Sequence, residues 1–453
     1  MTKYEKTVAM LEKKFSGNGI KLGLERILRA AERVGNPQSF FKSIIVAGTN
    51  GKGSVSAMLS SIMNNAGVKS GLYTSPHLFD IRERIRVEGK KIDKKRFLQI
   101  VNILENAGIS DVTYFEFLTL LSFLFFKERE VESAVLEVGL GGRFDAVNIA
   151  ESNICIITGI AVDHIQYLGN TIEKIAFEKA GVIRNRGIVI SGKLSKKAYE
   201  VIEKECKKKS AKLLLWGRDF KIDSLVSNLR SSVFDYMSED FICKNIKVPL
   251  AGEFQPYNAS LAITAFLEFL RLNKKKKKGI EIESAIQKGL YSTKWRGRME
   301  RIKLKDIEIL FDCAHNSNAL KYITSYISKE IDKREVILIF GVLSDKDIPK
   351  MLSLLNIRGL KIIFTTPCNE RAFSPYELKK VFDGDGVSTS VIANPFDAFK
   401  EASKKSASET LVCIAGSIYL VAPLLQFVDR LKKNDKSRKK LVKNFDFMNE
   451  CVE

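Results

Sequence analysis

A lysine stands among glycines and a serine directly after a short apolar run, in the stretch IIVAGTNGKGS at residues 44–54. An apolar strand, a glycine-rich turn and the start of a helix direct backbone N–H groups and the positive end of a helix dipole at one point. That arrangement suits a phosphate, and Lys52 would add a full charge. The generic Walker pattern is not met, because Val46 stands at its first glycine position and Gly53 separates Lys52 from Ser54. A plain strand-to-helix turn is therefore the alternative.

A second candidate is a glutamate inside the apolar strand pattern of LEVGLGGRFDAVN, residues 136–148. A carboxylate in such a strand costs free energy unless it is paired. We therefore expect Glu137 to bind a metal ion or a positive charge, with a salt-bridged structural glutamate as the alternative. The glycine-rich turn that follows carries Arg143 and Asp145.

All three histidines of the chain, His77, His164 and His315, follow strand-like runs among other polar residues. Parallel sheets bind ligands at the carboxyl ends of their strands, which is where Asp163 and His164 are expected. The stretch YTSPHLFDIRERI at residues 73–85 adds hydroxyl groups and a cluster of charged residues around His77. Each histidine alone is more often structural, but the three together indicate a polar site.

Strand-length apolar runs alternate with helical patterns along the chain, which predicts a parallel α/β fold. A chain of 453 residues is long enough for two domains. We place the boundary near residue 294, which gives a parallel-sheet domain at residues 1–294 and a smaller α/β domain at residues 295–453.

The composition sets limits on the protein class. Lysine and arginine outnumber the acidic residues by 74 to 53, a net charge of +21 that suits nucleic acid, anionic substrates or simply a lysine-rich surface. The densest basic runs, at 273–279 and 430–443, lack interleaved aromatic residues and are expected to be solvated surface. We find no apolar run of membrane-spanning length and no signal peptide, so a cytoplasmic protein is expected. The seven scattered cysteines suggest neither a zinc cluster nor a disulfide framework.

Taken in order, the motifs resemble the folylpolyglutamate synthase and dihydrofolate synthase family, within the Mur ligase superfamily. The resemblance spans nearly the whole chain, and in this family the lysine of the phosphate loop is followed by glycine and serine, as it is here. The matching segments are Gly48–Ser54, Thr74–His77, Glu137–Gly142, Asp163–His164, Glu178–Gly181, Gly297–Arg298 and Asp312–Asn316. The resemblance implies an N-terminal P-loop ATP-binding domain with a parallel sheet and a smaller C-terminal Rossmann-like domain.

The resemblance also implies a reaction. In this family ATP phosphorylates a carboxylate of the pterin substrate, and the amine of L-glutamate then displaces the phosphate to form an amide. The implied catalytic residues are Lys52, Glu137, His164 and Lys179, of which Lys179 is expected to be carbamylated. The implied Mg²⁺ ligands are Ser75, Glu137 and His164. A monovalent cation is a further cofactor that the family allows.

Substrate contacts are implied residue by residue. The implied ATP contacts are Thr49, Asn50, Gly51, Lys52, Gly53, Ser54, Asn258, Arg298, Asp312 and His315. The implied folate contacts are Phe115, Arg143 and Asp145, and the implied glutamate contacts are His315 and Ser417. The expected partners are ATP, L-glutamate and a folate or dihydropteroate, with no nucleic acid or membrane, and the chain is expected to be a monomer.

Two positions depart from the family pattern: Arg296 replaces a proline before Gly-Arg, and Val147 replaces a threonine. Two other functions stay open at this point. One is a Mur-type peptide ligase of cell-wall synthesis, which usually carries a further N-terminal domain, although only about 45 residues precede the phosphate loop here. The other is a basic P-loop protein that binds nucleic acid.

Overall fold

The computed structural model divides the chain into two compact units. Unit 1 comprises Met1–Pro249 and Glu253–Lys294, and unit 2 comprises Leu250–Gly252 and Trp295–Glu453. Residues 274–279 and 436–443, which hold most of the two lysine-rich runs, lie outside the described residues, as does Cys451. The described residues are 1–16, 19, 21–227, 230–273, 281–304, 307–404 and 410–435.

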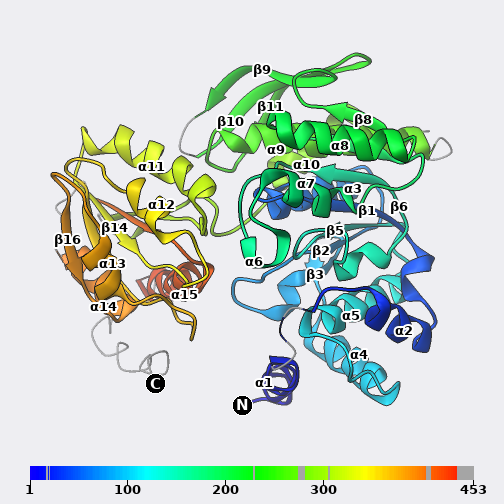
Figure 1. The fold of residues 1–453 in the computed structure, drawn as a ribbon, viewed down its shortest axis with the longest axis horizontal. Helices are drawn as coiled ribbons and strands as arrows, with labels where there is room; N and C mark the ends of the chain where they lie inside the picture. Colours follow the sequence, from blue (N-terminus) through cyan, green and yellow to red (C-terminus); the bar gives the residue numbers. More distant parts are fainter. Residues whose placement is uncertain are drawn as a thin grey trace. The chain divides into compact units, whose positions relative to one another are not determined.

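The main sheet of unit 1 has eight strands (Figure 1). β3 and β4 are antiparallel additions at one edge, whereas the other six strands run parallel. In spatial order the strands are β4 (Lys90–Lys91), β3 (Ile85–Val87), β2 (Ser70–Tyr73), β5 (Ser133–Glu137), β1 (Lys42–Ala47), β6 (Ser152–Ile157), β7 (Ile188–Ser191) and β8 (Lys212–Leu215).

β1 is the strand at which the order of strand addition reverses: later strands are added on one side of β1 first and then on the other. From β1 the chain crosses to β2 on one side, whereas from β5 it crosses back past β1 to β6. β1 is an almost fully buried run, KSIIVA, as expected for a strand covered on both faces. Ligands bind at such a switch point, beyond the carboxyl ends of the strands. The phosphate loop begins at this end of β1.

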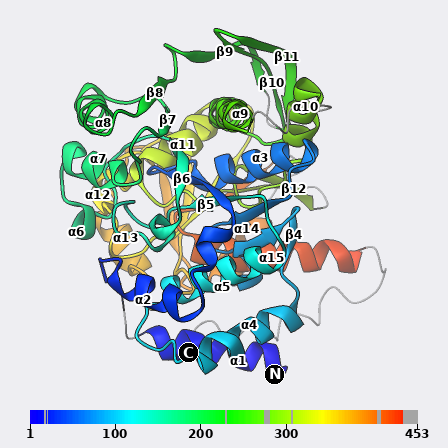
Figure 2. The ribbon, with the colours of Figure 1, turned by 90° about the vertical axis from the view of Figure 1, so that its right-hand side faces the viewer.

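Helices cover both faces of the main sheet (Figures 1 and 2). One face carries α3, α9 and α10, which contact one another or the strands beneath, and the other carries α5 with α1, α2 and α4 packed on it. The helices of unit 1 are α1 (Lys3–Ser16), α2 (Glu25–Arg33), α3 (Lys52–Asn65), α4 (Lys94–Asn106), α5 (Tyr114–Glu128), α6 (Ile165–Leu168), α7 (Ile172–Ala180), α8 (Lys196–Lys208), α9 (Phe254–Leu272) and α10 (Ile282–Ser292), with short 3₁₀ turns η1 (Pro37–Phe40), η2 (Ile81–Arg84) and η3 (Ala146–Ile149).

The start of α5 is fixed by a capping box. The Thr113 hydroxyl accepts the N–H of Glu116 at 3.2 Å, and the Glu116 carboxylate accepts the N–H of Thr113 at 2.7 Å. The same carboxylate pairs with Arg26 of α2 at 3.1 Å. The first turn of α5, which includes Phe115, is therefore held from two sides.

A three-stranded antiparallel sheet in unit 1 was not predicted from the sequence. Its strands are β9 (Phe220–Ser227), β10 (Ser232–Ser238) and β11 (Phe241–Val248), with β10 in the centre. Buried and partly buried residues alternate along β10, the pattern of a half-covered strand. A search for continuous apolar runs does not find such strands.

Unit 2 contains a six-stranded sheet of mostly parallel strands, in which only β12 is antiparallel to its neighbour. The crossovers after β13 and β16 run in opposite directions, so right-handed connections place α11 and α14 on opposite faces. The elements are β12 (Glu300–Leu304), β13 (Ile307–Phe311), α11 (Ser317–Ile331), β14 (Val336–Phe340), α12 (Ile348–Ser353), β15 (Lys361–Phe364), α13 (Pro375–Val381), β16 (Ser388–Val391), α14 (Pro395–Lys404), β17 (Leu411–Ala415) and α15 (Ile418–Asp435).

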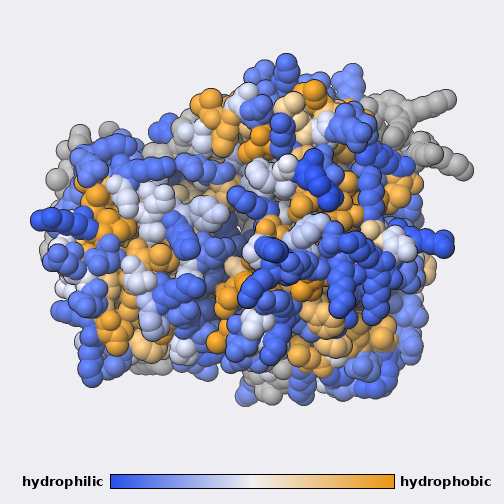
Figure 3. All heavy atoms as spheres, turned by 45° about the horizontal axis from the view of Figure 1, so that its top comes forward, coloured by the Kyte–Doolittle hydropathy of each residue, from blue (hydrophilic) through white to orange (hydrophobic). Residues whose placement is uncertain are grey.

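Within the described ranges, no helix is both long enough and apolar enough to cross a bilayer. On the face drawn in Figure 3, hydrophobic side chains are scattered among mostly hydrophilic ones. Of the six described cysteines, five are buried and Cys368 is partly exposed, and none forms a disulfide with another described cysteine.

Candidate active site

The phosphate loop joins β1 to α3, and backbone geometry fixes its shape. Gly48 and Gly51 have positive φ angles of 140° and 84°, a region that side chains rarely adopt. A Cβ at Gly48 would lie 1.9 Å from the Thr158 hydroxyl oxygen, and a Cβ at Gly51 would lie 2.7 Å from Asn258 Oδ1. Both glycines are therefore required by conformation and by close approach, and α3 begins directly afterwards at Lys52.

The loop is also bonded to the segment that follows β6. The Thr158 hydroxyl donates to the Asn50 carbonyl at 2.6 Å. The Thr49 hydroxyl donates to the Ala161 carbonyl at 3.1 Å and accepts the N–H of Ala161 at 3.0 Å. Thr158 and Ala161 were not predicted as site residues, because their role depends on contacts across more than a hundred residues.

Two lysines meet at the carbonyl oxygen of Gly48. Lys52 Nζ donates to it at 3.2 Å and also to the Thr49 carbonyl at 3.2 Å, and Lys179 Nζ donates to it at 2.8 Å. Lys179 is buried on α7, and burial lowers its pKa to about 7, with the nearby charge of Lys52 acting in the same direction. Around neutral pH a large share of this amine is therefore unprotonated.

The carboxylate of Glu137 lies at the end of β5, beside β1. Its side chain is buried, and one oxygen accepts the N–H of Ser75 at 3.1 Å. In the sheet register Glu137 lies opposite Val46, two residues before Gly48. The structure thus brings Glu137 and the start of the Ser75 loop to the same sheet edge as the phosphate loop.

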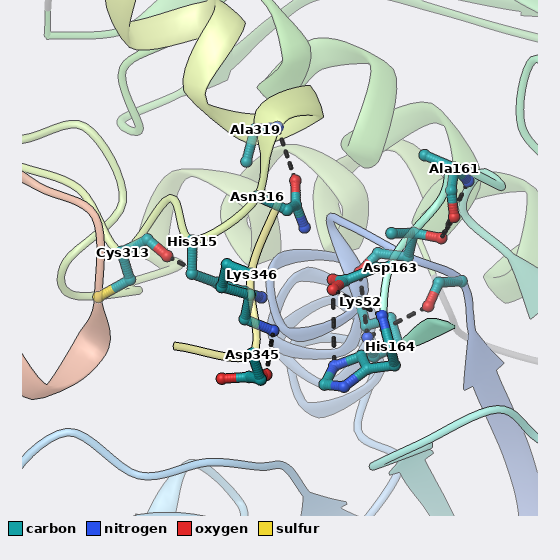
Figure 4. A network of polar contacts seen from close by, with 12 residues as sticks. Lys52, Ala161, Asp163, His164, Cys313, His315, Asn316, Ala319, Asp345 and Lys346 are labelled. Atoms are coloured by element: carbon teal, nitrogen blue, oxygen red, sulfur yellow. Dashed lines mark hydrogen bonds and ion pairs between the residues drawn. The ribbon is translucent and has the colours of Figure 1, made fainter. Parts of the chain in front are cut away.

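Asp163 and His164 lie on the segment between β6 and α6 (Figure 4). The N–H of His164 donates to Asp163 Oδ1 at 2.9 Å, and His164 Nε2 lies 4.0 Å from Asp163 Oδ2. His164 adopts the left-handed conformation with φ of 50°, immediately before α6. Thr49 is bonded to Ala161, so this segment is fixed next to the phosphate loop.

Phe115, Arg143 and Asp145 line the neighbouring part of unit 1. The Phe115 ring would lie 2.7 Å from a Cβ at Gly139 and is 5.8 Å from the Tyr73 ring centre. Burial raises the pKa of Asp145 to about 6, although its carboxylate accepts the N–H groups of Leu140 at 2.8 Å and Val147 at 3.1 Å, which favour the charged form.

Arg143 is held by the helix that carries Lys179. Its guanidinium carbon lies 4.0 Å from the Phe177 ring centre, its Nη2 donates to the Phe177 carbonyl at 3.1 Å, and its Nε lies 4.0 Å from a Glu178 carboxylate oxygen.

Asn258 is buried near the start of α9, where its amide donates to Gln255 Oε1 at 3.2 Å. Its Oδ1 is the atom that lies next to Gly51.

In unit 2 the expected residues lie at the carboxyl ends of β13 and β17. Asp312 follows β13, and its buried carboxylate accepts the N–H groups of Met299 at 2.8 Å and Ala314 at 2.7 Å, while burial raises its pKa. The Nδ1 atom of His315 lies 3.0 Å from the Cys313 carbonyl oxygen, and Asn316 caps α11 (Figure 4).

Ser417 is buried after β17, where its hydroxyl accepts the N–H of Tyr419 at 3.2 Å. Arg298 is partly buried on the segment that leads into β12. Arg296, which replaces the family's proline, pairs with Asp429 at 2.6 Å and Glu300 at 2.7 Å, so it ties this segment to α15.

The donor atoms fit a hard divalent cation. Within the described residues, no group of three or more His, Cys, Asp and Glu side chains is arranged to hold a metal ion. Mg²⁺ needs fewer protein ligands, because it keeps several waters and binds phosphate oxygens alongside one or two carboxylates. The buried Glu137 carboxylate beside Ser75 meets that need.

Comparison with known proteins identifies the family of the chain. Residues 46–266 match the Mur ligase middle domain, and residues 297–418 match the Mur ligase glutamate ligase domain. The chain is 31% identical to the dihydrofolate synthase/folylpolyglutamate synthase of Bacillus subtilis over 90% of its own length and 95% of that protein.

The chain belongs to the folylpolyglutamate synthase and dihydrofolate synthase family. Its structure resembles that of Mycobacterium tuberculosis folylpolyglutamate synthase complexed with ADP and AMPPCP, with a TM-score of 0.84, 27% identity, and coverage of 94% of this chain and 99% of the other.

A second solved member of the family is the bifunctional enzyme of Yersinia pestis, complexed with AMPPNP and a manganese ion. Its TM-score is 0.82 at 28% identity, with coverage of 95% of this chain and 98% of the other. The predicted fold class, a parallel-sheet α/β part followed by a smaller α/β part as in the Mur ligase fold, is confirmed.

Gly51→Ala should weaken ATP binding about tenfold or more, because it adds left-handed strain of about 1–3 kcal/mol and a contact with Asn258 in the phosphate loop. Calorimetric titration with ATP would measure the change in Kd. Gly67→Ala is the matched control, because Gly67 also has a positive φ of 74° but a Cβ there would meet nothing within 4 Å. Equal ATP affinity in the two variants would contradict the prediction.

Proposed function

We propose that this protein is an ATP-dependent ligase that joins the amine of L-glutamate to a carboxylate of a folate. The observation that carries the proposal is the meeting of Lys52 and Lys179 at the Gly48 carbonyl, one strand away from the buried carboxylate of Glu137. Positive charge on a phosphate loop beside an acidic metal position is what transfer of a phosphoryl group requires. The name of the Bacillus subtilis relative supports the same activity.

The proposed reaction has two steps. A substrate carboxylate oxygen bonds to the γ-phosphorus of ATP, ADP leaves, and an acyl phosphate forms. The neutral amine of glutamate then attacks the acyl carbon, phosphate leaves, and the amine loses a proton as the amide forms. No bond to the protein is made, so catalysis comes from positioning and from charge stabilisation.

Residues of unit 1 are assigned to the phosphates. Lys52 is assigned to stabilise the negative charge of the γ-phosphate during its transfer. The phosphate chain is assigned to the loop residues Thr49, Asn50, Gly51, Gly53 and Ser54. Glu137, Ser75 and His164 would hold Mg²⁺, which would neutralise part of the negative charge of ATP. The manganese ion in the Yersinia pestis structure supports use of a divalent metal.

Lys179 is proposed to react with CO₂ and become a carbamate. The reaction needs an unprotonated amine, and the buried ammonium beside Lys52 already favours that form. A carbamate would turn a repulsive pair of cations into an attractive pair and add an anionic oxygen ligand near the metal.

The folate ring is proposed to bind between Phe115 and Asp145, with Arg143 beside them. Above a pH of about 6 the Asp145 carboxylate is ionised and can accept N–H groups of the pterin. Asn258 is assigned to the adenine, and Arg298, Asp312 and His315 of unit 2 to the rest of ATP. His315 and Ser417 are assigned to glutamate, so residues 1–294 bind ATP and folate and residues 295–453 contribute to ATP and glutamate binding.

Several further properties are part of the proposal. The protein acts as a cytoplasmic monomer, uses a monovalent cation in addition to Mg²⁺, and binds neither nucleic acid nor membranes. A Mur-type peptide ligase and a nucleic-acid-binding protein are the functions it must be tested against. Phosphate-driven binding to nucleic acid would weaken steeply with salt.

The deciding experiment is incubation with ATP, Mg²⁺ and glutamate plus a reduced folate, read by mass spectrometry. The expected product is the folate with one or more added glutamates. ADP release should require the carboxylate acceptor, because it follows from acyl phosphate formation. Rapid ATP hydrolysis without an acceptor would refute the scheme.

Lys52→Ala should lower kcat/KM for glutamate addition by about three orders of magnitude, because it removes a charge that is needed in the transition state. The melting temperature should hardly change, because the loop glycines remain. Lys196→Ala, at an exposed lysine that begins α8, serves as the control. Activity within tenfold of the wild type would show that Lys52 does not contact the phosphates.

A carbamate on Lys179 should appear as a ¹³C resonance after equilibration with labelled bicarbonate, and Lys179→Ala should lack it. The same variant should lose activity, and acetate, which imitates the carbamate, should partly restore it. A spectrum that is identical in wild type and variant would rule out carbamylation.

One site is proposed to accept both dihydropteroate and folates, as the double name of the Bacillus subtilis relative suggests. Both substrates present a carboxylate to the same ATP, and they share the ring that Phe115 and Asp145 would hold. Asp145→Ala should therefore raise KM for both acceptors by about tenfold or more, since a charge-assisted hydrogen bond is lost. Loss for one acceptor alone would indicate separate sites.

A further inference from the structure

The loop at residues 75–84 begins and ends beside the proposed reacting centre. It begins at Ser75, whose N–H donates to the Glu137 carboxylate at 3.1 Å. It ends at Arg84, whose carbonyl oxygen accepts the N–H of Thr74 at 3.0 Å. The backbone of Arg84 therefore lies next to the residue that precedes Ser75, although the two are separated along the chain.

Two acidic residues of this loop form hydrogen bonds and an ion pair that stabilise its conformation. Asp80 caps η2, pairs with Arg82 at 2.6 Å and accepts the Tyr4 hydroxyl of α1 at 2.8 Å. A Glu83 carboxylate oxygen accepts the N–H of Leu78 at 3.0 Å. These contacts hold the conformation of the loop that ends at Arg84.

Arg84 differs from the other arginines of this region in its partners. Arg82 pairs with Asp80, and Arg86 donates to the Glu83 carbonyl at 3.1 Å. Arg84 donates its Nε–H to His77 Nδ1 at 3.0 Å, and it forms no ion pair with any acidic residue that the structure describes. It is a partly buried cation that donates a hydrogen bond to a histidine ring.

Arg84 lies beside aromatic side chains. Its guanidinium lies 6.0 Å from the Tyr114 ring centre, next in sequence to Phe115. Because His77 Nδ1 accepts the Nε–H of Arg84, that ring nitrogen carries no proton, and Nε2 is the ring nitrogen that can donate. Arg84 and His77 together offer hydrogen-bond donors and a positive charge that no described carboxylate pairs with directly.

We propose that Arg84, oriented by His77, binds the α-carboxylate of the terminal glutamate of a folate substrate and so favours acceptors that already carry glutamate. This inference rests on the proposed function. A glutamate has a second carboxylate only a short aliphatic chain away from the one that reacts, and a guanidinium fork matches that group. Dihydropteroate has only the reacting carboxylate, so it gains nothing from Arg84.

Arg84→Gln should therefore raise KM for tetrahydrofolate by about ten- to a hundredfold and leave KM for dihydropteroate within about twofold of the wild type. The kcat values should change little for either acceptor. Arg86→Gln is the matched control from the same hairpin and should affect neither acceptor. Equal loss for both acceptors in Arg84→Gln, or no loss for either, would overturn the proposal.

A binding measurement keeps this test separate from catalysis. Calorimetric titration would compare tetrahydrofolate with an analogue whose α-carboxylate is replaced by a carboxamide. The wild type should bind the analogue about ten- to a hundredfold more weakly, whereas Arg84→Gln should bind the two ligands equally. Equal discrimination in wild type and variant would overturn the role of Arg84, whereas absence of any glutamylated product would refute only the proposed function.

Discussion

Two lysine amino groups share one carbonyl oxygen at the end of β1, and the surrounding site is organised around that contact. Lys52 reaches the Gly48 oxygen from the first turn of α3, and Lys179 reaches it from α7. Two like charges so close together repel, and burial adds to the cost. The repulsion is relieved if one of the two lysines loses its proton or if an anion binds beside them. A phosphate group is an anion of the required kind.

The sheet makes this contact possible. β1 lies between β5 and β6, so the loop after β1 has a neighbour on either side: Glu137 at the end of β5 and Thr158 after β6. Glu137 places a carboxylate beside the loop, whereas Thr158 donates a hydrogen bond to the loop backbone. A shift of either strand by one residue would turn the wrong side chain toward the loop.

Several candidate site residues of unit 1 could be proposed from the sequence because they lie at or after strand ends, which are visible as breaks in apolar runs. Lys52, Glu137 and Asp163 were proposed as candidates in this way, and the structure places each of them at or after the end of a strand of the main sheet. The contact of Lys179 with Gly48 spans 131 residues, and no local pattern reports it. The sheet of β9, β10 and β11 was missed because its residues alternate between polar and apolar, and the ion pairs of Arg296 depend on Asp429, which lies 133 residues away.

The central position of β1 has a consequence for synthesis of the chain. Both partners of this strand come much later in the sequence: β5 ends at Glu137 and β6 at Ile157. Until the ribosome has released those residues, β1 presents two open edges of apolar, β-branched residues, which are the features that promote aggregation. Pairing over such separations also closes large loops and is slow. A nascent chain that stops before Ser152 therefore holds its phosphate loop on an incomplete sheet, with one edge of β1 still unpaired.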